Sequence, residues 1–191
     1  MRTAFLVPLA ALALAACEAT PPTITTDDIA DFNEASKAAS TLPTTAIGDL
    51  PAGTVSYFGQ FGSDASVEGV DNYSMIGDMR MNVRFNDQDV DGVINNVNLI
   101  QGGVPQQQMS GDLQIDGAAV NGVIVADASG DLWRVVANKS EFASIELELL
   151  GTVQTGLTDG DVVSGSVTGG GNGQFTVVLD GFGTFYGVAE Q

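Results

Sequence analysis

The chain has 191 residues, of which 44% are hydrophobic and 24 are glycine, so it can form one apolar core with many turns. Its 24 acidic and 6 basic residues give a formal charge of −18, which disfavours nucleic-acid binding because phosphates would be repelled. The absence of histidine excludes histidine-based acid–base catalysis, and the single cysteine excludes disulfides within one chain.

The N-terminal residues 1–16 have the pattern of an export signal. A short positive start precedes an apolar run, residues 5–13, that is too short to span a bilayer. The run ends in LAAC, residues 14–17, which resembles the lipobox of bacterial lipoproteins; an ordinary secretory signal is the alternative. The resemblance implies cleavage before Cys17, acyl chains such as palmitate on that cysteine, and, with Glu18 next, retention in the outer membrane.

Residues 17–49 are expected to form a lipidated tether with a short helix. The segment 18–26 reads EATPPTITT, a Thr- and Pro-rich composition that is typical of a tether. The run Thr25-Thr26-Asp27-Asp28 offers a hydroxyl cap and acidic residues for a first turn, and apolar residues such as Ile29 and Phe32 fall near one face. Together they predict a helix at about residues 27–40. This helix would either belong to the tether or plug one end of the domain.

From Gly53 onward the apolar residues recur with a period of two, which indicates strands. Residues 75–85 are the clearest case, and the apolar set there is Met75, Gly77, Met79, Met81, Val83 and Phe85. Residues 145–149 repeat the pattern, and further strands are expected at 54–61, 93–100, 113–116, 120–126, 132–137, 162–168, 175–180 and 184–186. Turn-forming residues between them lie at 62–64, 102–103, 116–117, 129–130, 158–160, 169–173 and 180–181.

Many short strands at regular spacing predict an all-β, antiparallel domain over residues 50–191. One-sided alternation favours a closed barrel or a sandwich over an open sheet, because closure removes exposed edges. A barrel that spans a membrane is the competing interpretation. The small number of short strands and the scarcity of aromatic residues, 7%, argue against it.

Four motifs carry a resemblance to a known family. They are PAGTVSYFG (51–59), GDMRMNVRF (77–85), DGVI (91–94) and DGFGTFYGVAE (180–190). Their order resembles the barrel strands of transferrin-binding protein B-type surface lipoproteins. The resemblance implies a small up-and-down β-barrel of about eight strands, filled by its own side chains, on a lipoprotein that an outer-membrane modulator carries to the surface. The chain lacks the handle region of that family, so transferrin binding is not carried over.

The stretch NDQDVDGVI, residues 86–94, resembles the start of a calcium loop. Asp87, Asp89 and Asp91 would supply ligands, but the twelfth position is Asn98 instead of Glu and the flanks alternate as strands. A hairpin turn whose side chains bond their own backbone is the alternative. Calcium at these three aspartates is therefore one hypothesis, and no other cofactor is expected.

These patterns lead to a binding protein rather than an enzyme. We expect a lipoprotein in the outer membrane, at the cell surface rather than in the periplasm, that recognises an extracellular protein or solute, with a link to iron or nutrient acquisition implied by the resemblance. Recognition is expected in the loops at 62–72, 101–108 and 155–161. A structural envelope lipoprotein without a small-molecule ligand is the alternative, and a glycan-cleaving enzyme with paired carboxylates is the third hypothesis.

Overall fold

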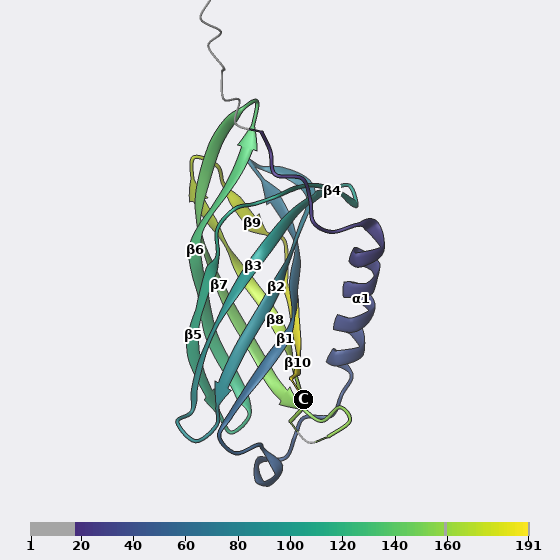
Figure 1. Ribbon diagram of the computed structural model, residues 1–191, viewed down its shortest axis with the longest axis vertical. Coiled ribbons are helices and arrows are strands. Elements are labelled where there is room, and N and C mark those ends of the chain that lie inside the picture. Colours follow the sequence, from purple (N-terminus) through teal and green to yellow (C-terminus); the bar gives the residue numbers. More distant parts are fainter. Residues whose placement is uncertain (1–17, 159, 191) are drawn as a thin grey trace, which may run out of the picture.

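The structure, a computed structural model, describes residues 18–158 and 160–190. These residues form one α-helix, α1 (Thr26–Ser40), a short 3-10 helix, η1 (Ile47–Asp49), and one antiparallel sheet (Figure 1). The strands are β1 (Thr54–Val67), β2 (Val70–Arg84), β3 (Asp89–Gln101), β4 (Val104–Gln108), β5 (Leu113–Val120), β6 (Val123–Val136), β7 (Lys139–Gln154), β8 (Val162–Gly173), β9 (Val177–Leu179) and β10 (Gly183–Ala189).

Eight of the described strands close into an up-and-down barrel. Each strand of the series β1-β2-β3-β5-β6-β7-β8 pairs antiparallel with the next, and β10 joins β8 back to β1. The short strands β4 and β9 extend the sheet at one end, where β4 pairs with β3 and β9 bridges β8 and β1. The predicted all-β class and the small antiparallel barrel are confirmed.

The barrel interior is filled by side chains. On β2 the predicted apolar residues from Met75 to Val83 point inward, and Met75, Met81 and Val83 are fully buried, while Phe85 follows the end of the strand and is half-buried. On β7, Ile145, Leu147 and Leu149 are buried while Glu146 and Glu148 are exposed. All of these apolar residues belong to one continuous core cluster that includes Tyr57, Phe61 and Phe185. The apolar positions of the alternation are therefore the face of each strand that packs in the core.

Several predicted turns are wrong, because their glycines lie inside longer strands. Residues 62–64, 116–117, 129–130 and 169–173 fall within β1, β5, β6 and β8. At Gly130 a Cβ atom would collide with the carbonyl oxygen of Asp112, so glycine is needed there for close strand approach. Most of the two segments expected as separate strands, 120–126 and 132–137, accordingly belongs to one strand, β6, while Val120 ends β5. The actual hairpin turns use positive φ angles at Glu68-Gly69, Asn121-Gly122 and Ala137-Asn138.

The predicted helix is present as α1, and its start follows the expected capping chemistry. Thr25 and Asp28 form a capping box, in which the Thr25 N–H donates to Asp28 Oδ2 at 2.7 Å. The hydrogen bonds from the Thr25 backbone and side chain lower the pKa of the Asp28 carboxyl. Within residues 18–158 and 160–190, no helix is long and apolar enough to cross a membrane.

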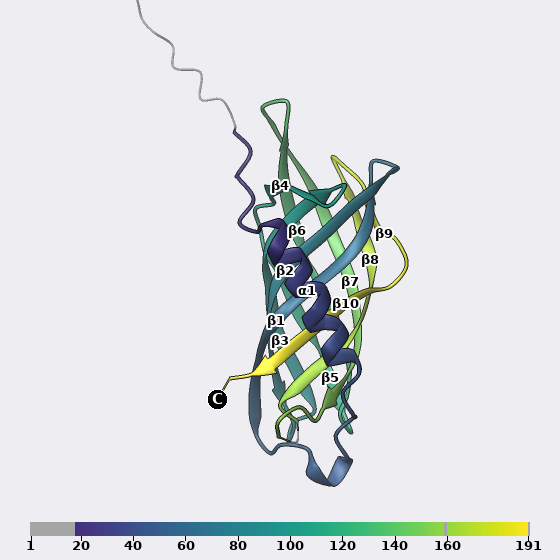
Figure 2. The same cartoon turned by 90° about the vertical axis from the view of Figure 1, so that its right-hand side faces the viewer.

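Helix α1 lies along the outer wall of the barrel, so it neither hangs free nor plugs a barrel end (Figure 2). Its Phe32 ring packs against two outward-facing residues, Ile76 of β2 and Ile100 of β3, and lies 6.1 Å from the Tyr186 ring. Gly62 of β1 leaves room for this ring, because a Cβ there would lie 2.5 Å from Phe32 Cε1. One further turn along the helix, the Ser36 hydroxyl donates to Thr184 Oγ1 at 2.8 Å.

The contact between Phe32 and Gly62 can be tested by a double-mutant cycle. We expect Phe32→Ala to lower the free energy of unfolding by about 3 kcal/mol, since it removes a buried aromatic side chain. Gly62→Ala should also destabilise the protein, because the added methyl group meets the ring. The double variant should lose less free energy of unfolding than the sum of the losses of the two single variants, since alanine at position 32 removes the clash with the methyl group at position 62. Urea unfolding measures all three values.

The matched control is Glu34→Ala, an exposed position on the same helix. It should leave the free energy of unfolding unchanged within about 0.5 kcal/mol. A Phe32→Ala variant that is as stable as Glu34→Ala would contradict the packing of α1 on the barrel wall.

Candidate functional site

The predicted site residues fall in two places. Cys17, the predicted lipid attachment site, lies outside the described residues. Asp87, Asp89 and Asp91 lie in the β2–β3 hairpin, as the hairpin alternative predicted: Asp87 is in the turn, and the other two begin β3. The turn closes with a hydrogen bond of 3.2 Å from the Asp87 N–H to the Arg84 carbonyl oxygen.

Arg84 engages the two strand aspartates of this hairpin. Its guanidinium donates to both Asp89 and Asp91 from the neighbouring strand. The Asn82 amide also donates to Asp91 Oδ1 at 2.7 Å, and this bond, together with the charges of Arg84 and Arg80, lowers the Asp91 pKa against the opposing effect of burial. No group of three or more metal-ligating side chains occurs in residues 18–158 and 160–190. A calcium ion here would have to displace Arg84.

The calcium hypothesis can be tested by thermal unfolding with and without metal. Because Arg84 occupies the carboxylate oxygens, we expect millimolar calcium to leave the Tm of the protein unchanged. Arg84→Ala frees both carboxylates, so in that variant calcium should raise the Tm if the three aspartates can hold the ion. A calcium-dependent rise in the wild-type protein that disappears in Asp89→Asn would show instead that the site binds calcium despite the ion pairs.

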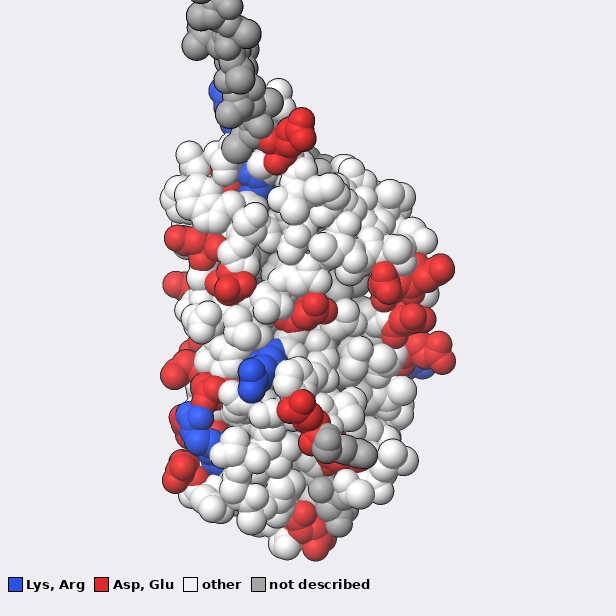
Figure 3. All heavy atoms as spheres, in the orientation of Figure 1, with Lys and Arg blue, Asp and Glu red and all other residues white. Residues whose placement is uncertain are grey.

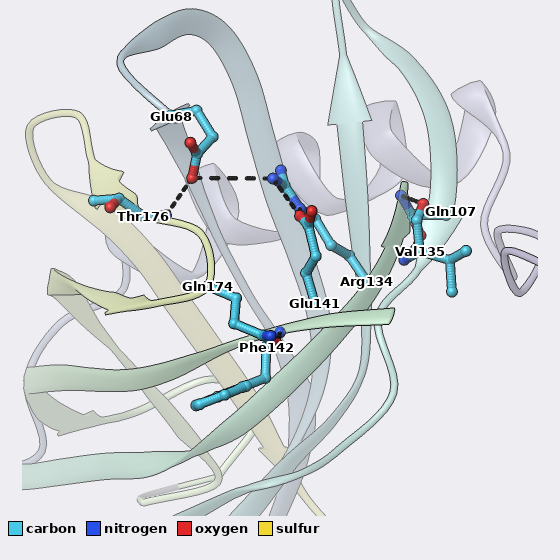
Figure 4. A network of polar contacts seen from close by, with 8 residues as sticks. All are labelled: Glu68, Gln107, Arg134, Val135, Glu141, Phe142, Gln174 and Thr176. Atoms are coloured by element: carbon cyan, nitrogen blue, oxygen red, sulfur yellow. Dashed lines mark hydrogen bonds and ion pairs between the residues drawn. The ribbon is translucent and has the colours of Figure 1, made fainter. Parts of the chain in front are cut away.

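One end of the barrel is covered by a polar network centred on Arg134 of β6 (Figure 4). The guanidinium lies 4.2 Å from the centroid of the buried Phe175 ring and forms ion pairs with Glu141 at 3.0 Å and Glu68 at 4.0 Å. Glu68 also accepts a hydrogen bond of 2.7 Å from the Thr176 N–H. The network therefore joins the β1–β2 and β6–β7 hairpins to the β8–β9 connection across this end.

The opposite end is covered by the segment before β1 and the loop before β8. Inside the barrel, the Tyr57 hydroxyl donates to the Gly160 carbonyl oxygen at 2.6 Å, and the Gly160 N–H donates to Thr45 Oγ1 at 3.0 Å. Burial raises the pKa of Tyr57, and the charge of Asp161 adds to the shift. Both ends of the barrel are thus occupied by the protein's own groups.

Asp161 orders the loop that precedes β8. Burial would raise the pKa of its carboxyl, but N–H donors of Thr158, Gly156 and Leu157 lower it overall. This loop falls within the predicted recognition loop at 155–161. The other two predicted recognition loops, 62–72 and 101–108, are instead the β1–β2 and β3–β4 hairpins with their strands.

A groove of about 480 Å³ lies on the outer wall between α1 and the strands β6, β7, β8 and β10. Ser36 and Ser40 of α1 form one side, and Leu150 and Val123 form the other. Its floor contains the buried pair Gln154 and Ser164, whose side chains are joined by a hydrogen bond of 2.9 Å, and the backbone of Gly151 and Gly165. The groove thus combines polar floor groups with an apolar edge.

The apolar edge continues as a strip of exposed aliphatic side chains on β5, β6 and β7. The members of this outer-wall strip are about half exposed, and register pairing places them side by side: Val120, Val123, Val125 and Leu150. Sequence analysis missed the strip, although the apolar run 123–126 and the doublet Leu149-Leu150 both break the alternation. Apolar residues on both faces of a strand indicate that its outer face is also suited to contact.

The charged side chains of the surface are mostly acidic. Figure 3 shows acidic side chains gathered along the α1 edge of the molecule and scattered over the visible strands, with few basic ones. Aspartates and a glutamate on the exposed side of α1 account for that edge: Asp27, Asp28, Asp31 and Glu34. The strip itself contains no charged residue, although the whole chain carries a formal charge of −18.

The fold and surface define a small, closed and internally packed β-barrel with a helix on its wall. Comparison of the chain with models of known protein families and with curated proteins returned no match in either case. The resemblance to transferrin-binding protein B-type lipoproteins therefore rests on the sequence motifs alone.

Proposed function

We propose that the protein is a lipid-anchored lipoprotein of the bacterial outer membrane, exposed at the cell surface, whose barrel binds another protein on its outer wall. The observation that carries this proposal is the filled interior. Tyr57, Phe61 and Phe185 are fully buried in the core, and both barrel ends are covered by the protein's own groups. A solute enclosed by the barrel is therefore disfavoured, and recognition falls to the outside.

The outer wall offers features that suit a protein partner. The groove beside α1 and the outer-wall strip together present apolar side chains next to hydrogen-bonding groups, as the centres of protein interfaces do. Four half-exposed aliphatic residues on adjacent strands form a contiguous surface on rigid elements. The net charge of −18 adds a preference for a partner with a basic surface around the contact.

The proposed lipid anchor at Cys17 and the outer-membrane location are supported by the lipobox resemblance. The cell-surface location, export by an outer-membrane modulator and the link to iron or nutrient acquisition are supported by the family resemblance. The proposed role requires no catalysis and no cofactor. A structural envelope lipoprotein without a specific ligand is the alternative. Location separates the two, because protease added to intact cells should digest a surface protein and spare a periplasmic one.

Capture experiments with the domain that begins at Glu18 test the binding surface. We expect Leu150→Glu to reduce capture of the partner about tenfold or more, since burying a carboxylate against an apolar surface costs more than about 1.4 kcal/mol. The matched control is Glu148→Gln, which alters an exposed residue two positions earlier on the same face of β7. The Glu148→Gln variant should still capture the partner. Measuring the affinity of the recovered partner for wild type and for each variant gives the fold-change in binding.

Two results would count against the proposal. Equal capture by wild type and Leu150→Glu would place the contact elsewhere on the molecule. Protection from protease in intact cells, together with no specific partner, would favour the structural role.

A further inference from the structure

The segment that follows Cys17 is not a free tether. The Thr20 carbonyl oxygen accepts a hydrogen bond of 3.1 Å from the Gln108 N–H at the end of β4. The Thr23 N–H donates to Asn98 Oδ1 at 2.9 Å, and the Asn98 amide donates back to Thr23 Oγ1 at 3.0 Å. Asn98 is fully buried, so the two bonds to Thr23 are made to a side chain held inside the protein, and with the Thr20 bond they attach the chain from Thr20 onward to the barrel.

This attachment lies at one particular end of the barrel. Gln107, the neighbour of Gln108, exchanges hydrogen bonds with the Val135 backbone at 2.9 and 3.3 Å (Figure 4). Val135 is close to the tip of the β6–β7 hairpin, so the tether joins the barrel beside that tip (Figure 1). Cys17 precedes Thr20 by three residues, which span at most about 11 Å. An acyl group on Cys17 is therefore confined to this end.

The same end exposes apolar side chains near the tips of three hairpins. They are between 42% and 55% exposed and form what we call the apolar rim: Val70, Val104, Trp133 and Val136. Trp133 packs against Phe142 at a ring-centroid distance of 5.1 Å and is still 42% exposed. Tryptophan favours the boundary between lipid headgroups and acyl chains, because its ring is large and amphipathic. The β6–β7 tip also carries an exposed cation, Lys139.

We propose that the apolar rim lies in the headgroup region of the bilayer that holds the Cys17 lipid, so that the barrel stands on the membrane by this end. The inference rests on the proposed lipid anchor. The other end also exposes apolar residues, Ile47 and Leu157. The short docked tether decides between the two ends, since the 16-residue strand β7 alone runs about 50 Å along its path.

This orientation has a consequence for the binding surface. The groove and the outer-wall strip lie toward the end opposite to the tether, because Val123 follows the Asn121-Gly122 turn and Gln154 ends β7 there. Contact of the rim with lipid therefore holds both features away from the membrane, where a protein partner can reach them.

The single tryptophan of the chain, Trp133, reports directly on this contact. The full-length gene is expressed in a bacterium that processes lipoproteins, and the purified product is placed in phosphatidylcholine vesicles whose acyl chains carry bromine. We expect Trp133 emission to shift to shorter wavelength and to be largely lost through quenching by bromine. The matched control is the double variant Trp133→Phe and Leu157→Trp, which moves the tryptophan to the opposite end and should keep its emission.

The outcomes separate the orientation from the anchor. Mass spectrometry of the purified protein tests whether Cys17 carries acyl chains, and an unmodified cysteine would overturn the anchor proposed above. The free thiol would then be coupled to a maleimide lipid, which fixes the chain at the same atom and tests the orientation independently. Unquenched Trp133 in membrane-attached protein, or quenching of the control instead, would overturn the orientation. A blue shift that needs only high protein concentration would assign the rim to a second copy of the chain.

Discussion

Closure of the sheet between β1 and β10 is the constraint on which the remaining features depend. Six residues of β1, from Tyr57 to Gly62, pair with β10 and leave no free edge between the first and last strands of the barrel. Closure makes every strand two-sided, with one face in a core of limited width and one face outside. It also requires small residues where large rings cross the interior. The ring of Phe185 is accommodated by the paired glycines Gly151 and Gly165, where Cβ atoms would lie 2.5 and 2.6 Å from it.

Because the interior is filled by side chains, the surfaces available for contact with other molecules lie on the outside of the barrel. The apolar residues that break the inward–outward alternation lie on the outside of the barrel, and some of them are covered there while others are exposed. Ile76 and Ile100 face outward and are buried by Phe32 of α1. Val125 and Leu150 face outward and are exposed, and Trp133 and Val136 lie near a hairpin tip beside the docked tether. Three sets of outward-facing apolar residues thus correspond to the contact with α1, the proposed contact with a partner protein and the proposed contact with the membrane.

The sequence allowed the fold to be predicted because alternation is a local property. Residues 75–85 and 145–149 are sufficient to assign a strand and its buried face, and the capping residues Thr25 and Asp28 are sufficient to start α1. Strand ends were less predictable, because a glycine such as Gly130 serves close strand packing as readily as a turn. The place of α1 was not predictable, since it depends on contacts between residues far apart in the chain, such as Phe32 and Gly62.

The candidate site likewise has features that could be predicted from the sequence and features that could not. The β2–β3 hairpin could be predicted, while the pairing of Asp89 and Asp91 with Arg84 requires strand register. The groove beside α1 arises only when the helix and four strands come together. The docking of Thr23 uses Asn96 and Asn98, which lie beside a break in the β2–β3 register, a feature that composition cannot reveal.

Hydrogen exchange of the backbone amides in β1 and β10 tests the closed barrel most directly. If these strands seal the sheet, the hydrogen-bonded amides from Phe185 to Val188 exchange as slowly as those in the middle of β6 and β7, because all open only with global unfolding. Exchange of the β10 amides at the rate of an unpaired edge, with β6 and β7 still protected, would show an open sheet and would contradict the account.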